Sequence, residues 1–331
     1  MITMKIYLVK RSFFNFRGKE SFELDLLGKN ILELMQENLG AEIIDGELPY
    51  GDKVVLYPVY PFLTEEKLNK FLRENEGSFS FEGGYVVRGG RESGFVGRIE
   101  QGLFSLADYP ALLNRAAREN AARLSKRGVL VEEGAEVSFL AEIHEGTIVE
   151  RGARIIGNCV IEKNVRIGKD SEIIESVIGE NSEIMRSVLE KSRVGNNTRI
   201  GPYAYLRPNS VVGDHCRIGD FVELKNCNFG NGSKSAHLSY IGDAEVGEKV
   251  NIGCGVVFAN YNGKTKSKSK VEDGCFIGSN CNLIAPVTVG AGSYLAAGTT
   301  LTKNLDTHDF CIGRCRETVK EGGAKKYLKK E

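Results

Sequence analysis

Residues 191–224 read KSRVGNNTRIGPYAYLRPNSVVGDHCRIGDFVEL, and an aliphatic residue returns at every sixth position of this stretch. The returning residues are Val194, Ile200, Leu206, Val212, Ile218 and Leu224. A period of six fits neither the 3.6-residue period of a helix nor simple strand alternation. It is typical of a short strand followed by a tight turn, three of which close one triangular coil of a parallel β-helix.

The same period extends far on both sides of this stretch. It includes Val131, Val137, Ile143, Val149, Ile155, Ile161, Ile167, Ile173, Ile178, Ile184 and Leu189 before it, and Ile241, Val246, Ile252, Ile277, Leu283, Val289, Leu295 and Leu301 after it. We expect the aliphatic side chains to point inward and to stack on their equivalents in the next coil. So many units in phase argue against an ordinary β-sandwich. The sequence therefore predicts a β-helix with a C-terminal tail over residues 129–331.

The period is interrupted once, between Phe258 and Cys275. The insert contains NYNGKTKSKSK from Asn260 to Lys270, with four lysines. A stacked solenoid accommodates extra residues by extruding a loop from a corner. The loop is interpreted either as a solvated tip or as a contact for an anionic ligand bound against the wall of coils.

A different pattern precedes the repeats. Residues 5–9 and 53–57 are predicted strands, and residues 30–39 and 64–77 are predicted helices, begun by Asn30 and Thr64. This alternation predicts a small α/β domain over residues 1–100, with a loop at 87–96. Residues 101–128 are predicted to be a loop and linker helix, helical over 108–126 with Pro110 in the first turn.

Composition restricts the function classes. The chain has 331 residues, with 44 Lys+Arg against 44 Asp+Glu, so the zero net charge removes the electrostatic reason to propose a nucleic-acid binder. It has no apolar run of membrane-spanning length and no signal-peptide pattern, so we expect a cytoplasmic protein that does not contact membranes. Its eight cysteines lack C-x-x-C and zinc-finger spacing, which predicts reduced thiols and no metal site.

Two cations mark a candidate phosphate site. Arg207 and Lys225 are one 18-residue coil apart, and each directly follows an inward aliphatic residue, so both are expected on the same wall. Such a pair suits a phosphate dianion, although two solvated charges are the alternative. His237 lies near this pair and near Tyr240 in sequence, which favours a catalytic base. His144, His215 and His308 lack such company and are expected to be surface residues.

The stretch from Gly201 to Leu301 resembles a known bacterial family. The segments that carry the likeness are GPYAYLRPNSVVG, GDFVELKNC, GSKSAHLSYIGDAEVGEKVNIGCG, ANYNGKTK, FIGSN and LIAPVTVGAGSYLAAGTTLT, followed by IGR at residues 312–314. They are similar to the acetyltransferase half of the bifunctional N-acetylglucosamine-1-phosphate uridylyltransferase/glucosamine-1-phosphate acetyltransferase. The resemblance implies a left-handed parallel β-helix and a homotrimer with acetyl-CoA sites in the clefts between subunits.

The resemblance also implies roles for individual residues. His237 matches the catalytic base, and Glu223 matches a carboxylate near it, which we expect to hold the imidazole ring. The residues that match sugar-phosphate ligands are Arg207, Lys225, Tyr240, Asn251 and Lys266. The residues that match acetyl-CoA contacts are Cys254, Asn260, Tyr261, Ser279, Ala297 and Arg314, with Cys254 at a position that is usually Ala.

The first 100 residues resemble the nucleotidyltransferase half of the family only weakly. That half requires a loop of the form G-x-G-[ST]-R-M, whereas residues 10–18 read KRSFFNFRG, and Val59 stands where the metal-binding Asp is expected. We therefore predict a shortened, degenerate domain that transfers no uridylyl group.

The predicted function is transfer of an acetyl group from acetyl-CoA, as co-substrate, to the amine of glucosamine-1-phosphate, in UDP-N-acetylglucosamine biosynthesis. Neither a metal nor a covalent intermediate on Cys254 is expected. Two alternatives remain open: an acetyltransferase acting on another amino sugar or sugar nucleotide, and a non-catalytic hexapeptide-repeat scaffold or regulatory binding protein.

Overall fold

The computed structural model describes residues 4–89 and 92–328 of the chain. The chain divides into two compact units, Met1–Val160 and Ile161–Glu331. The first unit contains a small α/β domain, a long helix and the first coils of the repeats. The second unit consists of further coils and a C-terminal tail.

The sheet of the α/β domain has the strand order β10-β8-β9-β7-β1-β6. Its strands are β1 (Lys5–Val9), β6 (Glu42–Ile44), β7 (Lys53–Leu56), β8 (Ser78–Phe81), β9 (Gly84–Val87) and β10 (Glu92–Phe95). Strand β1 pairs in parallel with both β6 and β7, whereas β9 pairs antiparallel with β7 and β8. The predicted loop at 87–96 is wrong for residues 92–95, because they pair in parallel with β8 as an edge strand, which their short, Gly-containing pattern does not indicate.

The helices begin at the predicted caps. The Oδ1 atom of Asn30 accepts a hydrogen bond from the Glu33 N–H at the start of α1 (Ile31–Leu39), and Gly40 ends that helix with a left-handed φ of 57°. Thr64 caps α2 (Glu65–Glu74), which ends earlier than the predicted position near Gly77. The remaining short elements of this domain are β2 (Asn15–Phe16), β3 (Lys19–Glu20), η1 (Ser21–Glu23), β4 (Asp25–Leu26) and β5 (Lys29–Asn30).

Helix α3 (Tyr109–Ser125) follows the short helix η2 (Leu106–Asp108) and has Pro110 in its first turn. Within the same unit it packs against the first coils, where the buried Asn120 amide donates a 2.7 Å hydrogen bond to the Val137 carbonyl. These coils contain β11 (Leu130–Val131), β12 (Glu136–Val137), β13 (Glu142–Ile143), β14 (Ile148–Val149) and β15 (Arg154–Ile156), followed by β16 (Val160–Ile161). Strand β11 pairs with β14 and β12 with β15, three strands later, as a three-walled coil requires.

The second unit is a left-handed parallel β-helix with three walls. Wall 1 contains β17 (Arg166–Ile167), β20 (Glu183–Ile184), β23 (Arg199–Ile200), β28 (Asn251–Ile252), β31 (Phe276–Ile277), β34 (Tyr294–Leu295) and β36 (Phe310–Cys311). Wall 2 contains β18 (Glu172–Ile174), β21 (Val188–Glu190), β24 (Tyr205–Leu206), β29 (Val257–Ala259), β32 (Asn282–Ile284) and β35 (Thr300–Leu301). Wall 3 contains β19 (Val177–Ile178), β22 (Arg193–Val194), β25 (Val211–Val212), β30 (Ser269–Val271) and β33 (Thr288–Val289).

Two long strands, β26 (Arg217–Phe229) and β27 (Lys234–Val246), continue through the corners and contribute to all three walls. Their register places Leu224 between Leu206 and Ile241, and all three side chains are fully buried. Phe229 and Ser235 are also buried, so they fill the inward positions that the aliphatic period leaves vacant between Leu224 and Ile241. The stack of inward-facing side chains therefore continues, with Ser235 as a polar member, through the region where the aliphatic period is interrupted in the sequence.

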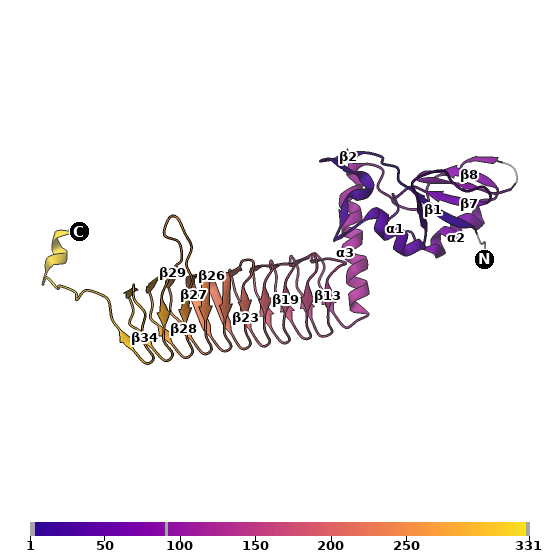
Figure 1. The fold of residues 1–331 in the computed structure, drawn as a ribbon. Helices are drawn as coiled ribbons and strands as arrows, with labels where there is room; N and C mark the ends of the chain where they lie inside the picture. Colours follow the sequence, from indigo (N-terminus) through magenta and orange to yellow (C-terminus); the bar gives the residue numbers. More distant parts are fainter. Residues whose placement is uncertain (1–3, 90–91, 329–331) are drawn as a thin grey trace. The chain divides into compact units, whose positions relative to one another are not determined.

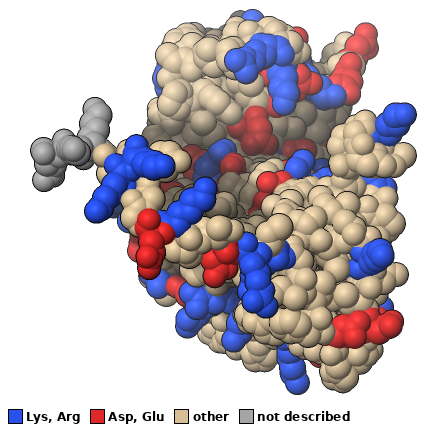
Figure 2. Space-filling view, turned by 90° about the vertical axis from the view of Figure 1, so that its left-hand side faces the viewer, with Lys and Arg blue, Asp and Glu red and all other residues tan. Residues whose placement is uncertain are grey.

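The insert forms a loop that projects beside β29, as Figure 1 shows for the second unit. The chain leaves the coils after β36 and contains one further short helix, η3 (Gly323–Lys326). Lys and Arg are interspersed with Asp and Glu on the face drawn in Figure 2, in keeping with the zero net charge. Within residues 4–89 and 92–328, no helix is long and apolar enough to cross a membrane.

Candidate active site

Arg207 and Lys225 lie on wall 2, one coil apart. The Arg207 N–H donates a 2.9 Å hydrogen bond to the Leu224 carbonyl, which fixes the register of the two cations. The Arg207 Nη1 atom is 2.9 Å from the Glu223 Oε1 atom, and this hydrogen bond raises the pKa of Arg207 above its ordinary value. The guanidinium is therefore held at the surface by a neighbouring carboxylate.

Lys225 contacts a second carboxylate, that of Asp243. The Lys225 Nζ atom is 3.4 Å from the Asp243 Oδ2 atom, and the side chain of Asp243 is only 9% exposed. The Asn226 amide donates a 2.8 Å hydrogen bond to Asp243, and the Asn260 amide donates another. Burial favours a higher pKa for Asp243, but the hydrogen bonds from the two amides and the charge of Lys225 outweigh it and lower the pKa.

Tyr240 lies beside this cluster because Gly242 leaves room for its ring. A β-carbon added at Gly242 would lie 2.4 Å from the Tyr240 hydroxyl oxygen. The Asn260 amide nitrogen is 3.4 Å from the same oxygen. Wall 2 thus presents two cations, a phenol and an amide, drawn from four successive coils.

His237 lies at the corner where wall 1 meets wall 2, opposite Asp220 of the preceding coil. The His237 Nδ1 atom is 2.9 Å from the Asp220 Oδ1 atom, and the His237 side chain is 60% exposed. The expectation that Glu223 holds the imidazole is wrong for this structure. Asp220 holds it, because the coil register brings Asp220 to His237 and Glu223 to Tyr240.

The corner between walls 1 and 2 continues through the predicted acetyl-CoA contacts. The strand registers align His237 with Cys254, Ser279 and Ala297 of the following coils. Arg314 reaches the end of this column, where its Nη1 atom donates a 2.7 Å hydrogen bond to the Ala297 carbonyl. We call these residues, with Asp220, the corner column: Asp220, His237, Cys254, Ser279, Ala297 and Arg314.

Three predicted residues lie elsewhere. Asn251 is exposed on wall 1, opposite Lys234 and Phe276 of the neighbouring coils. Tyr261 and Lys266 lie in the projecting loop, where they form a single β-bridge with each other. Within a single copy of the protein, Arg207 and Lys225 therefore lie together on wall 2, whereas Asn251 lies on wall 1.

Asp220 and Asp243 were missed by sequence reasoning. Asp220 precedes His237 by 17 residues, and Asp243 follows Lys225 by 18, so both distances equal about one coil. Searching for carboxylates one coil away from each candidate would have found both residues.

The cysteines differ in exposure. Cys254 and Cys315 are exposed, Cys311 is half-buried, and Cys159, Cys216, Cys227, Cys275 and Cys281 are buried. Within the described part of the chain, none of these cysteines forms a disulfide. Burial raises the pKa of Cys216, Cys227, Cys275 and Cys281, which makes these thiols less reactive. In the part of the chain that the structure describes, no cluster of His, Cys, Asp and Glu is arranged to hold a metal ion.

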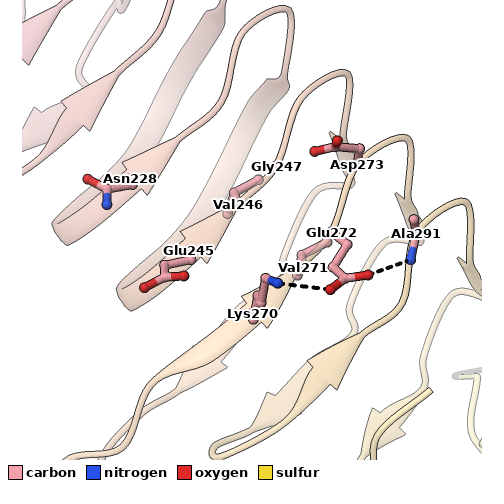
Figure 3. Close-up of a pocket in the computed structure, with 9 residues that line it drawn as sticks. All are labelled: Asn228, Glu245, Val246, Gly247, Lys270, Val271, Glu272, Asp273 and Ala291. Carbon is pink, nitrogen blue, oxygen red and sulfur yellow. Dashed lines mark hydrogen bonds and ion pairs between the residues drawn. The ribbon is translucent and has the colours of Figure 1, made fainter. Parts of the chain in front are cut away.

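A separate hollow of about 390 Å³ lies on wall 3 and includes Lys270, Glu272 and Ala291 in its lining (Figure 3). Lys270 and Glu272 point toward each other and form a 2.8 Å ion pair. Their hydrogen bond raises the pKa of Lys270 and lowers that of Glu272, and the Ala291 N–H also donates to Glu272. The charges of Lys270 and Glu272 therefore neutralise each other. On wall 2, Arg207 and Lys225 are likewise each paired with a carboxylate.

Comparison with known proteins agrees with the resemblance seen in the motifs. Residues 191–226 and 268–303 match the family described as bacterial transferase hexapeptide (six repeats). The bifunctional protein GlmU of Geobacillus sp. (strain WCH70) is 48% identical over 196 residues, which are 59% of this chain and 43% of that protein. GlmU of Alkaliphilus oremlandii (strain OhILAs) is 45% identical over 239 residues, which are 68% of this chain and 52% of that protein.

Among solved structures, a UDP-N-acetylglucosamine acyltransferase from Arabidopsis aligns over 56% of this chain and 70% of its own, with 14% identity. Its TM-score is 0.34, too low for a functional comparison. The chain spans about half the length of the curated relatives it matches. Over its hexapeptide repeats, this chain resembles the bifunctional GlmU proteins.

Proposed function

We propose that this protein transfers an acetyl group from acetyl-CoA to the amine of glucosamine-1-phosphate. One observation carries the proposal: the coil register sets the His237–Asp220 pair at one edge of wall 2 and the Arg207 and Lys225 cations on the same wall. A base at one edge of a wall that also presents two cations suits an acceptor that has both an amine and a phosphate. Similarity to GlmU over the repeats supports the same reaction class.

His237 acts as the general base in this proposal. Asp220 accepts a hydrogen bond from Nδ1–H, so the lone pair of Nε2 is free to take a proton from the amine. The amine nitrogen then forms a bond to the acetyl carbonyl carbon, the carbon–sulfur bond breaks, and CoA leaves as the thiolate. Asp220 stabilises the imidazolium that forms.

The corner column binds the acetyl donor. Its members beyond His237 present small or exposed side chains, Cys254, Ser279 and Ala297, along which an extended thiol arm can lie. Arg314 supplies a cation at the far end, and the projecting loop contributes Tyr261 near the other corner of wall 2. Asn260, at that same corner, contacts both Tyr240 and Asp243.

Arg207, Lys225, Tyr240 and Lys266 bind the sugar phosphate. Glu223 acts mainly by holding Arg207, because its carboxylate contacts that guanidinium. Asn251 completes the set from a neighbouring copy in a homotrimer, since its own wall faces away from Lys225. Mixed trimers of His237→Ala and Asn251→Ala chains should then regain part of the activity that each variant lacks alone.

The first domain transfers no uridylyl group in this proposal. Incubation with UTP, Mg²⁺ and N-acetylglucosamine-1-phosphate should release no pyrophosphate, and release above the no-enzyme blank would contradict this. The domain's six-stranded sheet is intact, so loss of activity is attributed to the missing Gly-rich loop and not to an unfolded domain.

The main test measures CoA thiol release with acetyl-CoA and glucosamine-1-phosphate. His237→Ala should reduce kcat by a factor on the order of 100 or more, whereas His215→Ala, a histidine on a different corner, should retain it. Near-full turnover in His237→Ala would overturn the assignment. A parallel screen of other amino sugars and sugar nucleotides tests the alternative acceptors, and acetyl-CoA binding without turnover on any of them would favour the scaffold.

A further inference from the structure

Asp243 links two parts of the candidate site that are assigned to different substrates. Its carboxylate contacts Lys225, which is assigned to the sugar phosphate, and Asn260, which is assigned to acetyl-CoA. Asn226 donates to the other oxygen at 2.8 Å. Among the residues that the structure describes, Asp243 is the only charged residue in the buried class.

The burial of this carboxylate requires an explanation. An unpaired charge in such a position is strongly destabilising, whereas one that accepts three hydrogen bonds is tolerated. The Asp243 backbone is left-handed, with a φ of 50°, and this turns the side chain from the corner toward Asn226 and Asn260. Both oxygens of Asp243 therefore accept hydrogen bonds from protein donors, Oδ1 from Asn226 and Oδ2 from Lys225 and Asn260.

We infer that Asp243 is a positioning residue that sets Lys225 and Asn260 at once, and so couples the acceptor site to the donor site. Lys225 has a long, flexible side chain, so it needs a fixed counter-charge to be held in one place before substrate arrives. Asn260 can present its amide in either of two orientations, and a carboxylate acceptor selects the one in which its NH₂ group faces Asp243. The inference rests on the proposed function.

The test is Asp243→Asn in the full chain. Asn is close in shape and tolerates left-handed φ, so the corner is preserved while the charge is removed. We expect KM for glucosamine-1-phosphate to rise roughly tenfold, the size expected for a misplaced charged hydrogen bond, and KM for acetyl-CoA to rise with it. In a Lys225→Ala background the same change should add little to the acceptor KM, because the two residues act as one unit.

Asp214→Asn is the matched control. Asp214 accepts a hydrogen bond from the Asn196 N–H at a different corner, and the equivalent positions of adjacent coils contain Asn196 and Asn231, which make the same kind of bond. Its kinetics should match those of the unsubstituted protein. If Asp243→Asn does not fold, Asn226→Gly removes one donor from Asp243 and should raise the acceptor KM about threefold.

The outcomes separate the two proposals. Absence of acetyl transfer by the unsubstituted chain overturns the proposed function. Activity with unchanged KM values in Asp243→Asn, or in Asn226→Gly where the first variant is unfolded, overturns this inference alone. A fully additive effect in the Lys225→Ala background also overturns it, since a purely structural defect would act independently of Lys225.

Discussion

Asp220 contacts His237 from the preceding coil, with 2.9 Å between the Oδ1 and Nδ1 atoms. The two residues are 17 positions apart in sequence and directly opposite in the ladder between β26 and β27. The ring orientation of His237 is therefore set by the stacking of coils and does not depend on a local turn.

Replacing Asp220 by Asn should slow the reaction without weakening binding. An amide can present NH₂ to Nδ1 and favour the wrong tautomer, so kcat should fall roughly tenfold or more while both KM values stay the same. Steady-state kinetics of CoA thiol release measure this. A rise in KM with unchanged kcat would show that Asp220 contributes to binding instead.

Replacing Glu223 by Gln separates its two possible partners. Because its carboxylate contacts Arg207, the loss of charge should raise KM for glucosamine-1-phosphate, by about threefold for an exposed pair, and leave the pH profile of kcat unchanged. The comparison is with Asp220→Asn in the same assay. A drop in kcat with an altered pH profile would instead assign Glu223 to His237.

The stability contributed by Asp243 should depend on pH in one direction. Its pKa is lowered from 3.8 in the folded chain, so its stabilisation is complete above that value and is lost as the pH falls through the lower folded pKa. The difference in Tm between the unsubstituted protein and Asp243→Asn should be constant above about pH 5 and shrink below about pH 4. A difference that grows toward acid pH would contradict the lowered pKa.

Leu224→Ala should destabilise the second unit by about 3 kcal/mol, because the side chain is fully buried between Leu206 and Ile241. Val211→Ala, at a position that is 40% exposed, is the control and should change stability by less than about 0.5 kcal/mol. Denaturant unfolding followed by circular dichroism measures both. Equal effects would argue that the coil interior is loosely packed.

The β-helix could be predicted because its inward-facing side chains share one interior and must nearly all be apolar, so they recur at a fixed spacing in the sequence. Where an inward position is polar, as at Ser235, or aromatic, as at Phe229, the aliphatic period is lost from the sequence although the wall continues. The edge strand β10 was missed for a different reason. Its pairing with β8 depends on a neighbour that no local pattern specifies.

For the candidate site, the sequence predicts which residues share a wall better than it predicts which side chains contact each other. The one-coil spacing was sufficient to put Arg207 and Lys225 on one wall. For His237 the family resemblance implies Glu223 as the partner, whereas Asp220 contacts the imidazole and Glu223 contacts Arg207. Asp220 and Glu223 are only three residues apart in the same coil. The carboxylate that contacts His237 is therefore decided by the exact register between β26 and β27, which pairs Asp220 with His237 and Glu223 with Tyr240.

The corner column also fixes the distance between His237 and Arg314. Successive coils are about 4.8 Å apart, so the four steps from His237 to Arg314 span roughly 19 Å. Inserting or deleting one coil between them would change this span by about 4.8 Å and leave every other contact of His237 intact. If the corner column binds the acyl donor as proposed, the number of coils sets the distance between His237 and Arg314 that the donor must span, and a change in that number would alter the distance in whole steps.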